Sequence, residues 1–246
     1  MSELARKAAG EGADLIVFPE ASMYPIDLPP AELSVAAEDL DGPFVTSLSA
    51  VASELGVTAI AGMFEKVADQ QRVHNTVVAV DRTGLLGQYR KLHLYDALGH
   101  KESDALVPGR IDGDELLVLP LEDFVVGVVT CYDLRFPELF RVLVDKGVTL
   151  FAVPAAWVPG PLKQEHWTTM CRARAIENTS YLAAAAQPPP RYCGHSLVLD
   201  PMGVELVSLL GGDGVATTEI LPERLRSVRE TLPVLAQRRY EVRPKT

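Results

Sequence analysis

The sequence predicts an α/β protein with a single domain, and two observations lead to this prediction. The chain has 246 residues, of which 48% are apolar, so it is long enough to bury one large core and short for two domains. Apolar, strand-like runs alternate with helix-like segments, which is typical of helices that cover sheets. No linker, low-complexity tract or fixed-period repeat interrupts the chain, so we expect residues 1–246 to fold as one unit.

The expected strands are short, and several are rich in Val and Ile without polar alternation, which indicates burial on both faces. In chain order the strands are expected at residues 15–18, 57–64, 76–80, 87–90, 125–130, 150–153, 181–186, 196–199 and 214–220. Helices are expected at residues 44–55, 137–146 and 163–178.

Turns and the C-terminal end complete this outline. Turn signals at residues 81–84 (DRTG) and 200–203 (DPMG) predict two hairpins. Residues 221–246 are charged and helical before the pattern fades. We expect this tail to be either loose or docked on a partner subunit.

Charge and cysteine content exclude several classes of protein. The formal net charge of -10 argues against nucleic acid or an anionic membrane as the partner. The three cysteines are odd in number and sparse, which fits a reducing compartment, and their spacing matches no zinc site. Neither a signal peptide nor an apolar run of membrane-spanning length is evident. We therefore expect a soluble, cytoplasmic protein.

Cys131 is the most informative residue in the sequence. It follows the apolar run of residues 125–130 and opens a polar turn, residues 132–138. A free cysteine at the end of an apolar strand is most often a small buried hydrophobe. Yet a strand that delivers a thiol to a turn also fixes a nucleophile, with the backbone N–H of Tyr132 free to face a developing oxyanion.

Two further ionisable residues end apolar strands, and their chemistry complements a thiol. Glu20 follows residues 15–19, where burial would raise its pKa and suit it to general acid and base catalysis. Lys91 follows residues 87–90; an isolated lysine there is usually a surface residue, but beside a thiol its ammonium could stabilise an oxyanion. His93 is an alternative base, for which we favour a structural role.

The residues around the thiol suggest how its turn is held. Asp133, Arg135 and Glu138 are expected to form an ion network within the turn.

Five stretches of the chain, taken together, resemble the nitrilase or carbon–nitrogen hydrolase superfamily. They occur in the order of that family and span nearly the whole chain: residues 12–20 (GADLIVFPE), 89–96 (YRKLHLYD), 131–138 (CYDLRFPE), 172–178 (RARAIEN) and 194–203 (GHSLVLDPMG). By this resemblance the Glu–Lys–Cys triad of the family falls on Glu20, Lys91 and Cys131. A second glutamate that positions the lysine falls on Glu102, and Ala155 and Trp157 fall on a segment that faces the substrate.

The resemblance also implies a fold, an assembly and a chemistry. The expected fold is a four-layer α-β-β-α sandwich, and the expected assembly is a homodimer in which helical layers meet. The expected reaction is hydrolysis of a small amide through a cysteine thioester, with no metal or organic cofactor. The branch it resembles most comprises the omega-amidases and deaminated-glutathione amidases, which act on monoamides of small dicarboxylic acids. Hydrolysis of N-carbamoyl compounds or nitriles, and a non-catalytic binding protein of the same fold, remain alternatives.

One feature departs from the family pattern. Members of the family normally begin with an additional short strand of the type Arg-Ile-Ala-Leu-Ala-Gln and a full helix, whereas only residues 1–10 precede the first matching stretch here. We therefore expect one strand position in the sheet to be empty or to be filled by another segment, because unpaired backbone groups at a sheet edge are costly.

Overall fold

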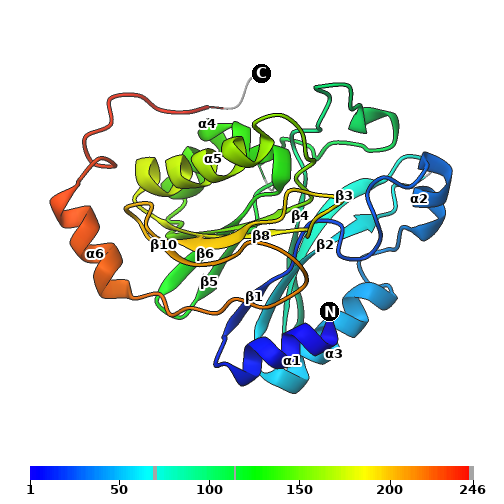
Figure 1. Cartoon of the computed structure of the whole chain (residues 1–246), viewed down its shortest axis with the longest axis horizontal. Helices are drawn as coiled ribbons and strands as arrows, with labels where there is room; N and C mark the ends of the chain where they lie inside the picture. The colour runs from blue at the N-terminus through cyan, green and yellow to red at the C-terminus, as the bar shows by residue number, and fades with distance from the viewer. Residues whose placement is uncertain (69–70, 114, 244–246) are drawn as a thin grey trace.

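Two mixed β-sheets pack face to face, with helices on their outer faces (Figure 1). The computed structural model describes residues 1–68, 71–113 and 115–243. The first sheet has the strand order β1-β2-β3-β4, and its strands are β1 (Leu15–Val17), β2 (Thr58–Glu65), β3 (His74–Asp81) and β4 (Gly84–Arg90). β1 runs parallel to β2, and the other two pairings are antiparallel.

The second sheet has the order β10-β9-β8-β7-β6-β5. Its strands are β5 (Val118–Leu121), β6 (Phe124–Val128), β7 (Leu150–Ala155), β8 (Tyr181–Ala186), β9 (Ser196–Leu199) and β10 (Glu205–Leu209). The three central strands, β6, β7 and β8, are parallel to one another. Their carboxyl ends therefore lie at one edge of the sheet, where binding sites of such sheets commonly form.

Helices cover each sheet on the side away from the other sheet. α1 (Ser2–Gly10) and α3 (Pro43–Leu55) pack on the first sheet, and α4 (Pro137–Asp145) and α5 (Lys163–Asn178) pack on the second (Figure 1). α2 (Pro30–Ala36) and the short 3-10 helices η1 (Glu102–Asp104) and η2 (Cys131–Arg135) lie in the loops. Proline at the first turn of α3 and of α4 fits the start of a helix, where no N–H partner is lost.

A third cluster of apolar side chains fills the space between the two sheets. Ile60, Val77 and Tyr89 of the first sheet meet Val126 and Leu150 of the second, and all five are buried. β7 is buried at all six of its residues because one face meets this cluster and the other meets α4 and α5. The prediction that Val- and Ile-rich strands are buried on both faces is confirmed for β3, whose Val77 lies in this cluster and whose Val78 and Val80 lie in the cluster with α1 and α3.

The two predicted hairpins are present. Asp81 pairs with Gly84 at the turn between β3 and β4, and Gly203 follows Asp200 in the turn between β9 and β10. The strand expected up to residue 130 ends earlier, at Val128, because the chain then turns into η2.

The prediction of a strand at residues 214–220 is wrong, because the described segment has no strand pairing there. A strand needs a partner about 4.8 Å away to hydrogen-bond with. β1 pairs only with β2 among the described strands, and an open groove of about 970 Å³ separates its free edge from residues 212–220. Residues of β8, β9 and β10 in the second sheet also line this groove.

The first part of the C-terminal segment is docked on its own chain. α6 (Pro222–Thr231) buries Leu225 and Val228, and Arg224 donates to Asp200 Oδ2 at 2.7 Å. Arg229 donates to the Thr179 carbonyl at 3.0 Å. Docking of the remaining tail on a partner stays a prediction, and residues 244–246 lie outside the described residues.

No helix in the described part of the chain is both long and apolar enough to cross a membrane.

Candidate active site

Three strand ends bring Glu20, Lys91 and Cys131 together. Glu20 follows β1, Lys91 follows β4 and Cys131 follows β6, so the face-to-face packing of the sheets places them side by side. The Lys91 ammonium donates to Glu20 Oε1 at 3.0 Å, and the Cys131 thiol lies next to the Glu20 carboxylate. The side chains of Glu20 and Lys91 are fully buried, and Cys131 is 7% exposed. The arrangement places a carboxylate between an ammonium and a thiol.

Glu102 joins this group from η1. Lys91 Nζ lies 2.9 Å from Glu102 Oε2 and 3.0 Å from Oε1, and the Tyr95 N–H donates to the same carboxylate at 2.7 Å. Two carboxylates therefore fix one buried ammonium, as a buried charge requires. The family resemblance predicts Glu102 at this position, beside Lys91.

Glu20 is also held by two groups that are absent from the sequence-based predictions. Asn75 Nδ2 donates to Glu20 Oε1 at 2.7 Å, and the Ala156 N–H donates to Oε2 at 2.7 Å. Asn75 lies buried inside β3, where asparagine is uncommon, so its place in an apolar strand was a usable signal. The Ala156 N–H carried no signal in the sequence because any residue except proline supplies one.

The turn that carries Cys131 is strained and firmly anchored. Cys131 has a φ of 48°, which a residue with a side chain rarely adopts and which is concentrated at functional sites. Asp133, fully buried, accepts from the Tyr89 hydroxyl at 2.7 Å and from the Thr130 N–H at 3.2 Å. His93 Nδ1 lies 2.7 Å from Asp133 Oδ1. The anchoring contacts compensate for the strain.

The expected ion network of Asp133, Arg135 and Glu138 is wrong. The oxygens of Asp133 are occupied by hydrogen bonds, and Arg135 lies over the rings of Tyr132 and Trp157, 5.7 and 5.0 Å from their centroids. Among the described residues, neither Arg135 nor Glu138 forms an ion pair. The structural role favoured for His93 agrees with its contacts, because its ring also stacks on Phe136 at 3.6 Å.

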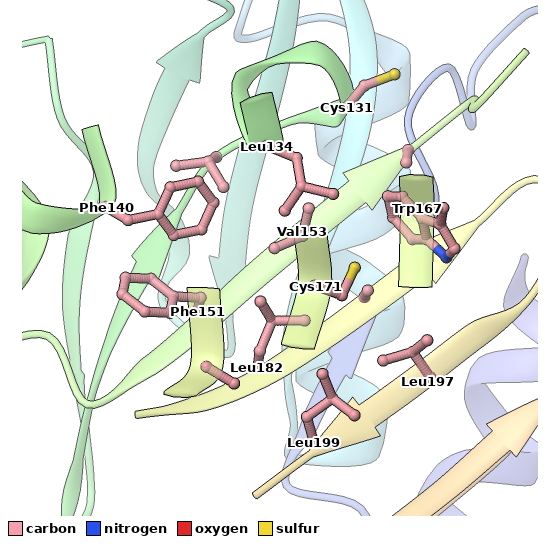
Figure 2. Close-up of a cluster of buried hydrophobic side chains, with 14 of the residues drawn as sticks. Cys131, Leu134, Phe140, Phe151, Val153, Trp167, Cys171, Leu182, Leu197 and Leu199 are labelled. Carbon is pink, nitrogen blue, oxygen red and sulfur yellow. The ribbon is translucent and has the colours of Figure 1, made fainter. Parts of the chain in front are cut away.

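The side chains of Cys131 and Cys171 point in different directions and have different neighbours. Figure 2 shows Cys131 at the edge of an apolar cluster with its sulfur pointing away from the cluster, whereas Cys171 lies among the apolar side chains. Burial raises the pKa of the Cys171 thiol strongly. Cys171 therefore behaves as a small hydrophobe, and Cys131 alone of the two reaches polar partners.

The electrostatics of the site correct the expectation for Glu20. Burial by itself would raise the pKa of Glu20, but the Lys91 charge and the hydrogen bonds from Cys131 and the Ala156 N–H together lower it below the ordinary value. Burial, followed by the charge of Glu20, raises the pKa of the Cys131 thiol well above its ordinary value. The resting site thus combines an ionised carboxylate with a protonated thiol.

The remaining predicted site residues lie around this group. Tyr132 is in the first turn of η2, where backbone N–H groups lack partners within the helix. Trp157 is buried and follows Ala156, whose N–H reaches Glu20. Ala155 ends β7 with its side chain in the apolar cluster under α4 and α5. The large groove beside β1 is lined by none of Glu20, Lys91 and Cys131.

In the described part of the chain, no group of three or more His, Cys, Asp and Glu side chains is placed to hold a metal ion.

The chain matches a known protein family over most of its length. The carbon–nitrogen hydrolase model matches residues 1–230. The chain belongs to the carbon–nitrogen hydrolase family. It is a hydrolase that acts on carbon–nitrogen bonds.

Relatives of this carbon–nitrogen hydrolase are similar over almost the whole chain. The deaminated glutathione amidase of Escherichia coli O157:H7 is 38% identical, covering 97% of this chain and 90% of its own. An omega-amidase of Xenopus tropicalis is 31% identical, and the match covers 98% of this chain and 88% of the relative. A crystal structure of a carbon–nitrogen hydrolase superfamily protein from Xanthomonas campestris superposes with a TM-score of 0.85 at 26% identity. The match covers 98% of this chain and 90% of that protein.

In this carbon–nitrogen hydrolase, Gly62 of β2 controls the position of Glu20. A Cβ on Gly62 would lie 2.7 Å from the Ala21 nitrogen and 2.8 Å from Glu20 Cα, so the backbone that carries Glu20 would have to move. We expect Gly62→Ala to lower kcat/KM about 100-fold, the effect of displacing a reacting group by roughly 1 Å. The measurement is steady-state kinetics. Gly10→Ala is the control, because a Cβ there meets nothing within 4 Å. Equal activities of the two variants would contradict the role of Gly62.

The pKa directions also predict the pH dependence of this hydrolase. Glu20 is ionised above its lowered pKa, and the raised pKa values keep Cys131 protonated and Lys91 charged. We expect kcat/KM to be constant from about pH 6 to about pH 8, because this quantity reports the free enzyme. Activity should fall only in acid, with an apparent pKa below 4.5. Intrinsic fluorescence at each pH distinguishes this loss of activity from unfolding. A decrease of kcat/KM that begins near neutral pH would contradict the lowered pKa of Glu20.

Proposed function

We propose that this carbon–nitrogen hydrolase cleaves small linear amides to a carboxylic acid and ammonia through a thioester on Cys131. The observation that carries the proposal is the position of the Glu20 carboxylate, which accepts from the Lys91 ammonium and lies next to the Cys131 thiol in a buried site. A non-catalytic binding protein would have no use for all three groups in this arrangement.

Acylation follows from the protonation states. Glu20 accepts the thiol proton as the sulfur of Cys131 attacks the amide carbonyl, so the thiol need not ionise beforehand. Lys91 and the Tyr132 N–H stabilise the oxyanion. Glu20 then gives the proton to the amide nitrogen, the carbon–nitrogen bond breaks, and ammonia leaves.

Deacylation uses the same base a second time. Glu20 takes a proton from a water molecule that attacks the thioester carbonyl, and the proton returns to the sulfur as the carbon–sulfur bond breaks. One water is consumed, and one carboxylic acid and one ammonia are formed. Division into two steps lowers each barrier. In this scheme Glu102 positions Lys91, and the segment from Ala155 to Trp157 borders the substrate.

The proposed substrates are monoamides of small dicarboxylic acids or the related 2-oxo amides, and the similarity to amidases of that kind supports this choice. The experiment is a screen for ammonia release from small amides, N-carbamoyl amino acids and nitriles. We expect release from an anionic monoamide. Preference for N-carbamoyl compounds or nitriles would replace the amide assignment with one of the two alternatives.

A trapped intermediate tests the class of protein independently of the substrate screen. Acid quenching during turnover should leave an acyl group, detected by peptide mass spectrometry on Cys131 and absent from Cys171 and Cys193. No acyl adduct and no ammonia from any compound would favour the non-catalytic binding protein.

We also propose that the chain forms one domain of the four-layer α-β-β-α type and assembles as a homodimer through its helical layers. The apolar clusters on both sides of each sheet support the layer order. Ile176 on α5 is 41% exposed, which supports contact on that helical layer. Sedimentation should give the mass of a dimer, and a monomer at all concentrations would contradict the assembly.

A further inference from the structure

Lys163 is a buried cation that the proposed mechanism does not use. It is the first residue of α5, and it is only 5% exposed. Its ammonium donates to the Tyr95 hydroxyl at 3.1 Å and lies 4.5 Å and 4.7 Å from the ring centroids of Tyr95 and Trp157. Within the described part of the chain, no carboxylate forms an ion pair with it.

Three physical terms act against a lysine at this place. Burial removes the water shell of the ammonium, and such charges are normally paired. The first turn of a helix carries the positive end of its dipole, which disfavours a cation. The aromatic rings and one hydroxyl compensate in part, but they supply no negative charge. The main chain of Lys163 accepts the Trp157 indole N–H at 2.8 Å, yet any residue could supply that carbonyl. The side chain therefore needs another explanation.

The two rings beneath the ammonium connect it to the catalytic group. The Tyr95 N–H donates to Glu102, which holds Lys91, and the Tyr95 ring lies 5.0 Å from the ring of Tyr132. Trp157 directly follows Ala156, whose N–H donates to Glu20. Lys163 thus contacts two aromatic residues that are linked to the residues holding Glu20 and Lys91.

A second cation lies on the same aromatic surface. The Arg135 guanidinium is 5.0 Å from the Trp157 ring centroid, and it too lacks an ion pair among the described residues. The positive charge of Lys91, in contrast, is already matched by Glu20 and Glu102. The Lys91 ammonium near the thiol is therefore paired with carboxylates, whereas the unpaired positive charges of Lys163 and Arg135 lie beside Trp157.

We infer that Lys163 binds a carboxylate at the end of the substrate remote from the amide, and so selects anionic amides over neutral ones. The inference rests on the proposed amidase function and adds the residue that recognises the substrate. A substrate carboxylate would provide the counter-charge that the chain leaves out, and charge-assisted hydrogen bonds of this kind are among the stronger ones.

The test compares two amides of similar shape that differ in charge. Succinamate carries a carboxylate at the remote end, and 4-methylpentanamide carries an isopropyl group there. We expect the wild-type protein to prefer succinamate at least tenfold in kcat/KM. In Lys163→Met, which keeps the apolar stem on the rings, kcat/KM for succinamate should fall about 10- to 100-fold, mainly through KM. The value for 4-methylpentanamide should change less than about threefold. Lys146→Met, at an exposed lysine after α4, is the control.

Each result separates the inference from the function on which it rests. An equal loss on both amides would show that Lys163 only supports the structure, and no loss on succinamate would show that it does not bind the carboxylate. A wild-type protein that cleaves both amides equally well would overturn the inference but leave the amidase function standing. No ammonia from any amide would overturn the function itself.

A binding measurement provides a readout besides turnover. Calorimetric titration with succinate should give binding to the wild-type protein and to Lys163→Arg, and at least tenfold weaker binding to Lys163→Gln. Equal affinities in all three would contradict the inference even if Lys163→Met failed to fold.

Discussion

Replacement of Cys131 by alanine is expected to abolish amide hydrolysis, with a loss of kcat of about 10⁴-fold or more, as for other catalytic nucleophiles. The thiol forms the thioester, and no neighbouring group can replace it, because Glu20 and Lys91 are already bonded to each other. Ammonia release under saturating substrate measures the effect. The fold should persist, since only a thiol at the edge of an apolar cluster is removed.

The matched control is Cys171→Ala, which removes the same atom from the interior of that cluster. We expect it to lower the thermal unfolding temperature slightly and to leave kcat within about twofold, since small core truncations act on stability. Full activity in Cys131→Ala, or equal losses in the two variants, would exclude a thioester on Cys131.

Replacement of Glu20 by glutamine is expected to reduce kcat about 1,000-fold, within the range for loss of a general base. Glutamine keeps the size of the side chain but cannot accept the proton from Cys131. The charge of Glu20 also raises the pKa of that thiol, so its removal should lower the pKa of Cys131. Hydrolysis should therefore fall while alkylation of Cys131 by iodoacetamide at pH 8 becomes faster.

Slower hydrolysis together with faster alkylation of Cys131 would show that Glu20 acts as a base and does not only support the structure. Unfolding or collapse of the site would expose all three cysteines, and peptide mapping would then find alkylation of Cys171 as well. Glu54→Gln is the control, because Glu54 is an exposed carboxylate that pairs with Arg6 far from the thiol. If Glu20→Gln retained more than a tenth of wild-type activity, another residue would have to act as the base.

The family resemblance placed the candidate triad on Glu20, Lys91 and Cys131, and each of these residues also follows an apolar strand in the sequence. Glu20, Lys91 and Cys131 interrupt runs that are otherwise buried, and an ionisable residue at such a place is costly unless it has a partner. Glu102 needed the family resemblance, since it lies in a loop region without hydrophobic periodicity. The helices at residues 163–178 and 137–146 were visible as well, because their signals are local.

The errors had physical reasons that lie outside local sequence. Residues 214–220 have the composition of a strand, but a strand depends on a partner edge, and the space beside β1 is empty of described strands. The pKa of Glu20 was expected to rise because burial acts in that direction. Its decrease depends on Lys91 and on the Ala156 N–H, which are 71 and 136 residues away along the chain.

The sequence by itself indicated the α/β fold class and the family, and through the family resemblance it proposed Glu20, Lys91 and Cys131 as the reactive groups, because periodicity and motifs are read locally. Only the tertiary structure decided which protons the groups carry, how Asn75 and Ala156 hold Glu20, and that Lys163 is buried without a counter-charge. Burial and electrostatic pairing are sums over neighbours that the packing of two sheets brings together, and no single stretch of sequence contains them.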